Sequence, residues 1–172
     1  AWAAYENVEF SSLTNHDGLT NSQVGAILKD TRGYIWFGTQ SGLCRFDGFR
    51  MKTIYYINTD DKSLPNNSVD ELQQDYGGNI WVHTSVGYCI YKYDEEQFER
   101  KPEEWLKNIH VQGPPYKLLI DKDKNMWIAV YGQGLYYHNA KTKNTYLFKF
   151  TKKAQPGCLK EGNISKITEV DG

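Results

Sequence analysis

The sequence predicts an all-β protein, and three observations favour this fold class. Aromatic residues are abundant, with 13 Tyr, 7 Phe and 5 Trp among 172 residues, and such residues are enriched in strands. Glycine or aspartate interrupts the apolar segments at short intervals, which is typical of turns between short strands. One pattern of apolar and turn residues also recurs along the chain, which predicts a repeat architecture.

The repeat has three copies, each anchored by a tryptophan. From Trp36 to Trp81 is 45 residues, and from Trp81 to Trp127 is 46. An aspartate precedes each tryptophan by six residues and a glycine follows it by six or seven. The anchoring residues, to which we assign a structural role in the repeat, are Asp30, Trp36, Gly42, Asp75, Trp81, Gly87, Asp121, Trp127 and Gly134. The copies differ at one second-strand position, where Gly38 becomes His83 and then Ala129.

Each copy reads as four short strands. In the first copy we expect strands at Val24–Lys29, Tyr34–Thr39, Leu43–Phe46 and Arg50–Tyr56. The tryptophan strand is apolar at consecutive positions, which indicates burial of both of its faces. Four strands per repeat with both faces covered predict blades of a β-propeller. A helix is expected only at Glu103–Asn108, between the second and third copies.

The predicted organisation is a single partial β-propeller domain over residues 1–172. We expect a lead-in strand within 5–20, blade repeats at about 21–58, 66–100 and 113–150, and the start of a fourth repeat at 163–172. Three blades do not close a ring, so the first and third blades would each present an apolar sheet face. Exposed apolar area of that kind favours association, and we expect the isolated chain to form a dimer or larger assembly.

Composition argues against several function classes. The net charge is −1, so no basic excess exists to bind nucleic acid. The three cysteines form no CxxC pair, and the four histidines have no metal-ligand spacing. We therefore expect no metal, no cofactor and no nucleic-acid partner. Ala1-Trp2-Ala3 weakly matches the end of a signal-peptide cleavage site, which would indicate export.

The segment from Asp30 to Asp47, with its Gly-x-Ile-Trp-x-Gly-Thr core, resembles the two-component regulator propeller repeat. The segments from Leu13 to Leu19 and from Ser63 to Val69 resemble parts that flank such repeats. The resemblance implies the periplasmic sensor region of a hybrid two-component histidine kinase from a glycan-degrading bacterium. In that family two seven-bladed propellers and a small β-sandwich precede a membrane span and a kinase. It thus implies further blades and the C-terminal sandwich as partners of this chain.

The repeated residues favour structural roles over chemical ones. The tryptophans could stack on sugars, but their recurrence at one position indicates packing between blades. The repeated aspartates are interpreted as turn formers rather than catalytic acids. Cys44 and Cys89 are expected as small buried residues. His83 is the one residue of the repeat to which we give a possible functional role, because it replaces the glycine of the first copy. No catalytic residue is assigned.

The residues that do not repeat are better candidates for binding. In a propeller, the loops entering each innermost strand and those between second and third strands gather on one face. Their amides, hydroxyls and one tyrosine suit a sugar, although surface loops are polar in any case. The candidate oligosaccharide-binding residues are Asn21, Gln40, Ser41, Asn67, Ser85, Tyr131 and Gln133. A propeller enzyme, such as a polysaccharide lyase or hydrolase, and a protein-interaction scaffold remain as alternatives.

Overall fold

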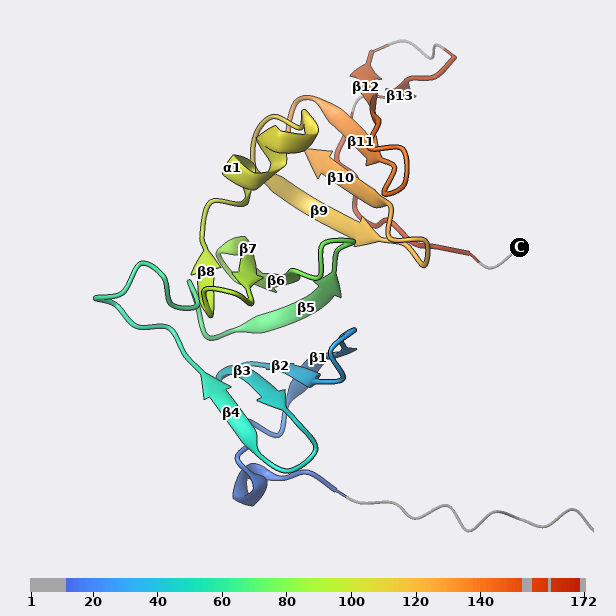
Figure 1. Cartoon of the computed structure of the whole chain (residues 1–172). Helices are drawn as coiled ribbons and strands as arrows, with labels where there is room; N and C mark the ends of the chain where they lie inside the picture. The colour runs from blue at the N-terminus through green and yellow to red at the C-terminus, as the bar shows by residue number, and fades with distance from the viewer. Residues whose placement is uncertain (1–11, 153–155, 161, 171–172) are drawn as a thin grey trace, which may run out of the picture.

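Three antiparallel sheets follow one another along the chain and pack against each other in that order (Figure 1). We call each sheet a blade. The computed structural model describes residues 12–152, 156–160 and 162–170. Blade 1 contains β1 (Val24–Lys29), β2 (Ile35–Thr39), β3 (Gly42–Phe46) and β4 (Met51–Ile54). Blade 2 contains β5 (Val69–Gln74), β6 (Ile80–Thr84), β7 (Gly87–Lys92) and β8 (Gln97–Glu99). Blade 3 contains β9 (Pro115–Ile120), β10 (Met126–Val130), β11 (Gly134–His138) and β12 (Thr145–Thr151).

The all-β prediction is therefore confirmed, and the strands of each blade are arranged in the order of the sequence. One extra strand and one helical link are added to this four-stranded pattern. The short strand β13 (Leu159–Lys160) pairs in parallel with β12 and gives blade 3 a fifth strand. The helix α1 (Pro102–Leu106) and the following 3₁₀ turn η2 (Lys107–Ile109) lie where a helix was expected, at Glu103–Asn108. Proline starts this helix because the first helical position needs no N–H donor.

One turn closes the first hairpin of every blade. In blade 1 a carboxylate oxygen of Asp30 accepts two backbone N–H groups of the turn at 2.9 and 3.0 Å. Its other oxygen accepts the indole N–H of Trp36 at 2.7 Å. The same aspartate–tryptophan hydrogen bond recurs in blades 2 and 3 at 3.0 and 3.2 Å. Each aspartate thus holds its turn and also satisfies the only polar group of the tryptophan side chain, which is buried in blades 1 and 2.

The core lies between the blades rather than at one centre. Trp36 is fully buried in the cluster between blades 1 and 2, and Trp81 is 1% exposed in the cluster between blades 2 and 3. Leu106 and Ile109 of the helical link complete the second cluster. Trp127 occupies the same repeat position but is only half-buried, because it faces away from blade 2. Cys44 and Cys89 are buried free thiols.

The segment before β1 covers the outward face of blade 1. Residues 12–23 contain the 3₁₀ turn η1 (Asn15–Asp17) and no strand, and the expected lead-in strand otherwise falls at 5–11, outside the described residues. Leu19 is buried against Phe37 and Cys44. The backbone N–H of Thr20 lies 3.4 Å from Cys44 Sγ. Contrary to our expectation of an open sheet, this face therefore has a partial cover.

The segment after β13 lies against blade 3. The N–H of Ile164 donates to the Tyr116 hydroxyl at 2.9 Å, and the N–H of Lys122 donates to Glu169 at 3.0 Å. Residues 163–172 were expected to open a fourth repeat; the described part, 163–170, forms no strand. A strand requires a ladder partner, and no described strand pairs with this segment. None of the described helices has the length and apolar character needed to cross a membrane.

Candidate functional site

The innermost strands all begin at the same end of the blades. Because the ladders are antiparallel, the β2–β3, β6–β7 and β10–β11 turns lie at that end too. We call this surface the loop face; it comprises residues 20–23, 40–41, 66–68, 85–86, 112–114 and 131–133. All seven candidate binding residues lie on it.

The candidate residues of blades 1 and 2 are engaged in hydrogen bonds within the protein. Asn21 Nδ2 donates to Ser41 Oγ at 2.9 Å, and Gln40 Oε1 accepts from the Ser68 hydroxyl at 2.8 Å. Two further contacts involve the Asn67 side chain, which accepts the N–H of Tyr56 at 2.7 Å, and the backbone N–H of Ser85, which donates to Ser68 at 3.2 Å. These hydrogen bonds fix the loops and occupy much of the polar capacity that a ligand would use.

The candidate residues of blade 3 line cavities instead. Tyr131 is 64% exposed, and its ring stacks on Tyr116 with centroids 4.0 Å apart. Both rings border a groove of about 380 Å³ between blades 2 and 3, which we call the interblade groove. Its other lining residues are His83, Val86, Gly87, Tyr88, Arg100, Pro102, Glu103, Pro114 and Pro115. Gln133 lies on the other side of the same turn, in a second cavity.

A β-bulge recurs in the blades near the point where the groove opens. In blades 1 and 2, the ladder between the first two strands skips one first-strand residue: Gly25 in blade 1 and Asp70 in blade 2. The residue after each bulge pairs with the variable second-strand position, which is Gly38 or His83. Bulges redirect side chains and are frequent at functional sites. The repeat thus offers two adjacent positions per blade at which side chains can vary.

Blade 1 has glycine at both positions, and blade 2 packs directly onto it. A Cβ on Gly38 would lie 2.6 Å from Val69 Cγ1, and a Cβ on Gly25 would lie 3.3 Å from the Val69 carbonyl oxygen. Blade 2 carries Asp70 and His83 instead. Asp70 contacts His83, and His83 lines the groove opposite Pro115 and Tyr116 of blade 3. A glycine at this position would not hold the two blades apart, so we attribute the groove to the larger side chain.

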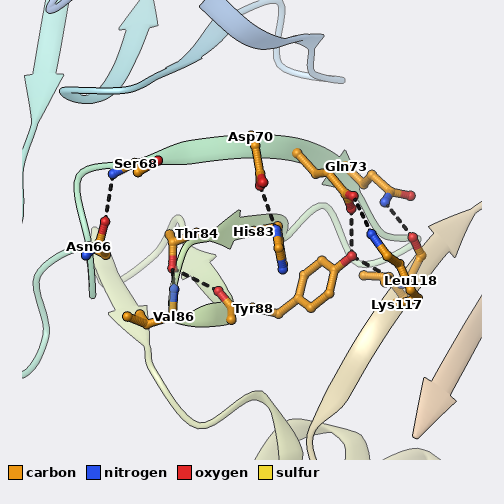
Figure 2. Close-up of polar contacts among 12 residues, drawn as sticks. Asn66, Ser68, Asp70, Gln73, His83, Thr84, Val86, Tyr88, Lys117 and Leu118 are labelled. Atoms are coloured by element: carbon orange, nitrogen blue, oxygen red, sulfur yellow. Dashed lines mark hydrogen bonds and ion pairs between the residues drawn. The ribbon is translucent and has the colours of Figure 1, made fainter. Parts of the chain in front are cut away.

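The two side chains form a pair, shown in Figure 2. His83 Nδ1 lies 2.6 Å from Asp70 Oδ1, and the centroids of the His83 and Tyr88 rings are 4.4 Å apart. Hydrogen bonding of one ring nitrogen to a carboxylate orients the imidazole and leaves the other nitrogen for a different partner. His83 lines the interblade groove, so this arrangement presents one imidazole nitrogen for recognition.

The hydroxyl group of Tyr88, which also lines the groove, connects blade 2 to blade 3 by hydrogen bonds (Figure 2). The Tyr88 hydroxyl donates to Glu71 Oε2 at 2.6 Å and accepts the N–H of Leu118 at 3.2 Å. Glu71 also pairs with Lys117 Nζ at 3.3 Å. Two causes raise the pKa of Tyr88 far above its usual value: burial, which is the larger, and the hydrogen bond to Glu71. Tyr88 therefore acts as a neutral crosslink between the blades.

Sequence reasoning singled out His83 and Tyr131 but missed Tyr116, Arg100 and the helix start at Pro102. A signal for Tyr116 did exist, because it aligns with Gly25 and Asp70 in the three copies. The ladder of blade 3 skips Tyr116 as the ladders of blades 1 and 2 skip those residues. No comparable signal marks Arg100, whose guanidinium binds backbone carbonyls of residues 60, 63 and 64. Within the described part of the chain, no group of three His, Cys, Asp or Glu side chains is placed to hold a metal ion.

Comparisons with known proteins agree with this architecture. Residues 18–41 match the family model of the two component regulator propeller. A curated histidine kinase, P4 of Formosa agariphila, is 43% identical over 61 residues, which are 36% of this chain and 4% of that protein. The extracellular domain of BT3049 from B. thetaiotaomicron, assigned as a hybrid two component system, superimposes with a TM-score of 0.58 at 24% identity. That match covers 81% of this chain and 20% of the other.

The fold and the repeat together define part of a β-propeller. The model of the two-component regulator propeller matches the first of its three copies, at residues 18–41, which overlaps the segment from Asp30 to Asp47 that resembled this repeat. The chain spans only a small part of the relatives that it matches, about one twenty-fifth of the curated kinase and one fifth of the solved domain. What those longer proteins do as a whole is therefore not assigned to this chain by the match.

Proposed function

We propose that this chain is a ligand-recognising part of a sensor propeller and that it binds an oligosaccharide in the interblade groove. The observation that carries the proposal is the stacked pair Tyr116 and Tyr131, of which Tyr131 is largely exposed at the groove. A tyrosine offers a flat apolar ring together with a polar tip. That combination suits a pyranose, which has apolar C–H faces and equatorial hydroxyl groups.

The remaining lining supports the same class of ligand. His83, held by Asp70, offers one ring nitrogen, and Glu103 offers a carboxylate. Binding sites commonly combine apolar walls with a few convergent polar groups. A cavity of about 380 Å³ lies at the small end of the range for ligand sites, and it is open, so a longer chain can extend beyond it.

We further propose that the sensor is extracytoplasmic, in the periplasm, and that ligand binding regulates a histidine kinase elsewhere in a longer protein. The family match and the likeness to an extracellular domain support this location. The partners within that protein would be further propeller blades and a C-terminal sandwich. In this proposal the chain itself performs no catalysis.

The test is titration calorimetry of glycan oligosaccharides against the complete propeller that contains this chain. Tyr131→Ala should weaken binding about tenfold or more, as loss of a stacking ring does at such sites, without changing the melting temperature. Gln40→Ala should have a smaller effect, because its amide already binds Ser68. Thr53→Ala on the outer strand β4 is the control. Equal losses from Tyr131→Ala and Thr53→Ala would refute a site in the groove.

The pairing of His83 with Asp70 favours one alternative, a polysaccharide lyase or hydrolase, because a carboxylate-oriented imidazole can act as a general base. Chromatographic analysis of each bound glycan after prolonged incubation separates the two functions. Shortened or unsaturated products that disappear with His83→Gln would establish the enzyme. A protein-interaction scaffold would bind no glycan at all.

A further inference from the structure

A second cavity adjoins the interblade groove on the same side of blade 3. It encloses about 570 Å³, and we call it the outer cavity. Its walls are the link between blades 2 and 3 and the outer strand β12, together with the β10–β11 turn. The residues that line it are His110, Gln112, Gly132, Gln133, Tyr136, Thr145, Tyr146, Leu147, Lys149 and Phe150.

The two cavities are separated by a thin partition. Gln112 lines the outer cavity and Pro114 lines the interblade groove, two residues further along. On the opposite wall, Gly132 lines the outer cavity and Tyr131 lines the groove. A hydrogen bond of 2.7 Å from Gln133 Nε2 to the Gln112 carbonyl closes the partition. A linear ligand stacked on Tyr131 therefore needs to pass only one turn to reach the outer cavity.

The chemistry of the outer cavity differs from that of the groove. Lys149 and His110 contribute basic groups, and two amides and three hydroxyl-bearing side chains surround them. Among the described lining residues, none is Asp or Glu, whereas the groove contains Glu103. Strand alternation places Thr145, Leu147 and Lys149 on one face of β12, together with Tyr136 of the neighbouring strand.

Tyr136 and Gln133 preorganise this wall. The Tyr136 hydroxyl donates to Gln133 Oε1, and Gln133 Nε2 donates to the Gln112 carbonyl. Tyr136 is buried, and the Thr145 hydroxyl donates to the Ile109 carbonyl at 2.6 Å. Beside this fixed wall, the side chain of Lys149 is exposed and contributes a positive charge to the cavity. Ammonium groups bind carboxylate, sulfate and phosphate oxygens through charge-assisted hydrogen bonds.

We propose that the outer cavity is a subsite for an acidic sugar unit, one that bears a carboxylate or a sulfate. This inference rests on the proposed function and narrows the ligand to an acidic oligosaccharide that lies across the partition. The unit on Tyr131 is bound by stacking, and the adjoining unit is bound through its anionic group by Lys149, with His110 and Gln112 beside it.

The experiment compares acidic oligosaccharides with their neutralised forms on the complete propeller that contains this chain. The probes are oligogalacturonates and their methyl esters, and sulfated galactan oligosaccharides and their desulfated forms. We expect the acidic member of a pair to bind at least tenfold more tightly, with an affinity that falls as salt is added. The two pairs distinguish carboxylate from sulfate.

Lys149→Gln should weaken binding of the acidic probe about tenfold, which corresponds to the loss of one charged hydrogen bond. The affinity for the neutral probe should not change. Lys141→Gln, the same change of charge in the β11–β12 turn at the other end of the blade, is the control. Equal affinity for acidic and neutral probes, or no effect of Lys149→Gln, would overturn the subsite while the Tyr131 result still stands. Failure of every probe to bind would overturn both proposals.

Discussion

His138 is the one described residue with a buried side-chain nitrogen that has no hydrogen-bond partner. The Thr145 hydroxyl donates to the Ile109 carbonyl, so it accepts from His138 Nδ1 at 2.9 Å. The proton of the neutral ring is therefore on Nδ1, and the buried Nε2 carries a lone pair. Burial, with a smaller contribution from nearby Lys143, lowers the pKa of His138 below its ordinary value of 6.5.

This tautomer predicts a pH dependence. Because the pKa is lower in the folded chain than in the unfolded one, the unfolded chain binds more protons once the pH falls below about 6.5. The stability that His138 contributes is complete above that pH and is lost as the pH falls towards the folded pKa. Urea denaturation at pH 7.5 and 5.0 should show this loss, and His138→Phe should reduce it. An identical pH dependence in His138→Phe would contradict the assignment.

The repeated tryptophans differ in burial, so they should differ in their contribution to stability. Trp81→Ala should lower the free energy of unfolding by about 3–5 kcal/mol, as large buried aromatic residues do. Trp127→Ala is the matched control, because it removes the same ring and the same aspartate hydrogen bond from a half-buried position. Its loss should be clearly smaller. Equal losses, measured by urea denaturation, would show that the blade interface does not determine the effect.

At the scale of elements, the sequence predicted the strands well and the groove poorly. The spacing of tryptophan and aspartate located the three blades because every blade repeats one turn and one buried ring. The helix between blades 2 and 3 was expected at Glu103–Asn108, one residue after the observed start of α1 at Pro102. The groove could not be predicted because it depends on the distance between two sheets, which is set by Gly25 and Gly38 in one blade and by larger side chains in the next. β13 is too short to leave a pattern.

Close packing at Gly38 gives a prediction about the interface between blades 1 and 2. Gly38→Ala would place a Cβ 2.6 Å from Val69 Cγ1, and such overpacking costs about 1–3 kcal/mol. The double variant Gly38→Ala/Val69→Ala should be less destabilised than the sum of the two single variants, because the second change removes the clashing methyl group. Additive losses in a thermal denaturation series would show that the two residues do not touch.

At the scale of the whole molecule, the two end blades are unequal. Leu19 and Thr20 cover the outward face of blade 1, whereas the outward face of blade 3 holds a half-buried Trp127 with residues 167–169 beside it. That face borders a cavity of about 310 Å³ formed by Leu119, Trp127 and Leu135 with this segment. The incomplete cover favours blade 3 as the surface through which separate chains would associate.

We therefore predict that the isolated 172-residue chain self-associates through blade 3. Sedimentation equilibrium at micromolar concentration should give a mass above that of one chain, and Leu135→Asp should reduce it, since a buried unpaired charge is unfavourable. Ile27→Asp, at an exposed position of β1, is the control and should leave the mass unchanged. A monomer at all concentrations would show that residues 162–170 already cover blade 3.

The bulge and the residue that faces it give the repeat an economical way to diversify. The turn, the tryptophan and the glycine that begins the third strand can stay constant while only two positions per blade change. With glycine at both, adjacent sheets close on one another; with larger side chains, a crevice opens. A ring of such blades can thus gain, lose or relocate a recognition site through two point mutations. If the interblade groove binds a ligand as proposed, differences in specificity among proteins with this repeat should lie chiefly at those paired positions, one pair for each blade.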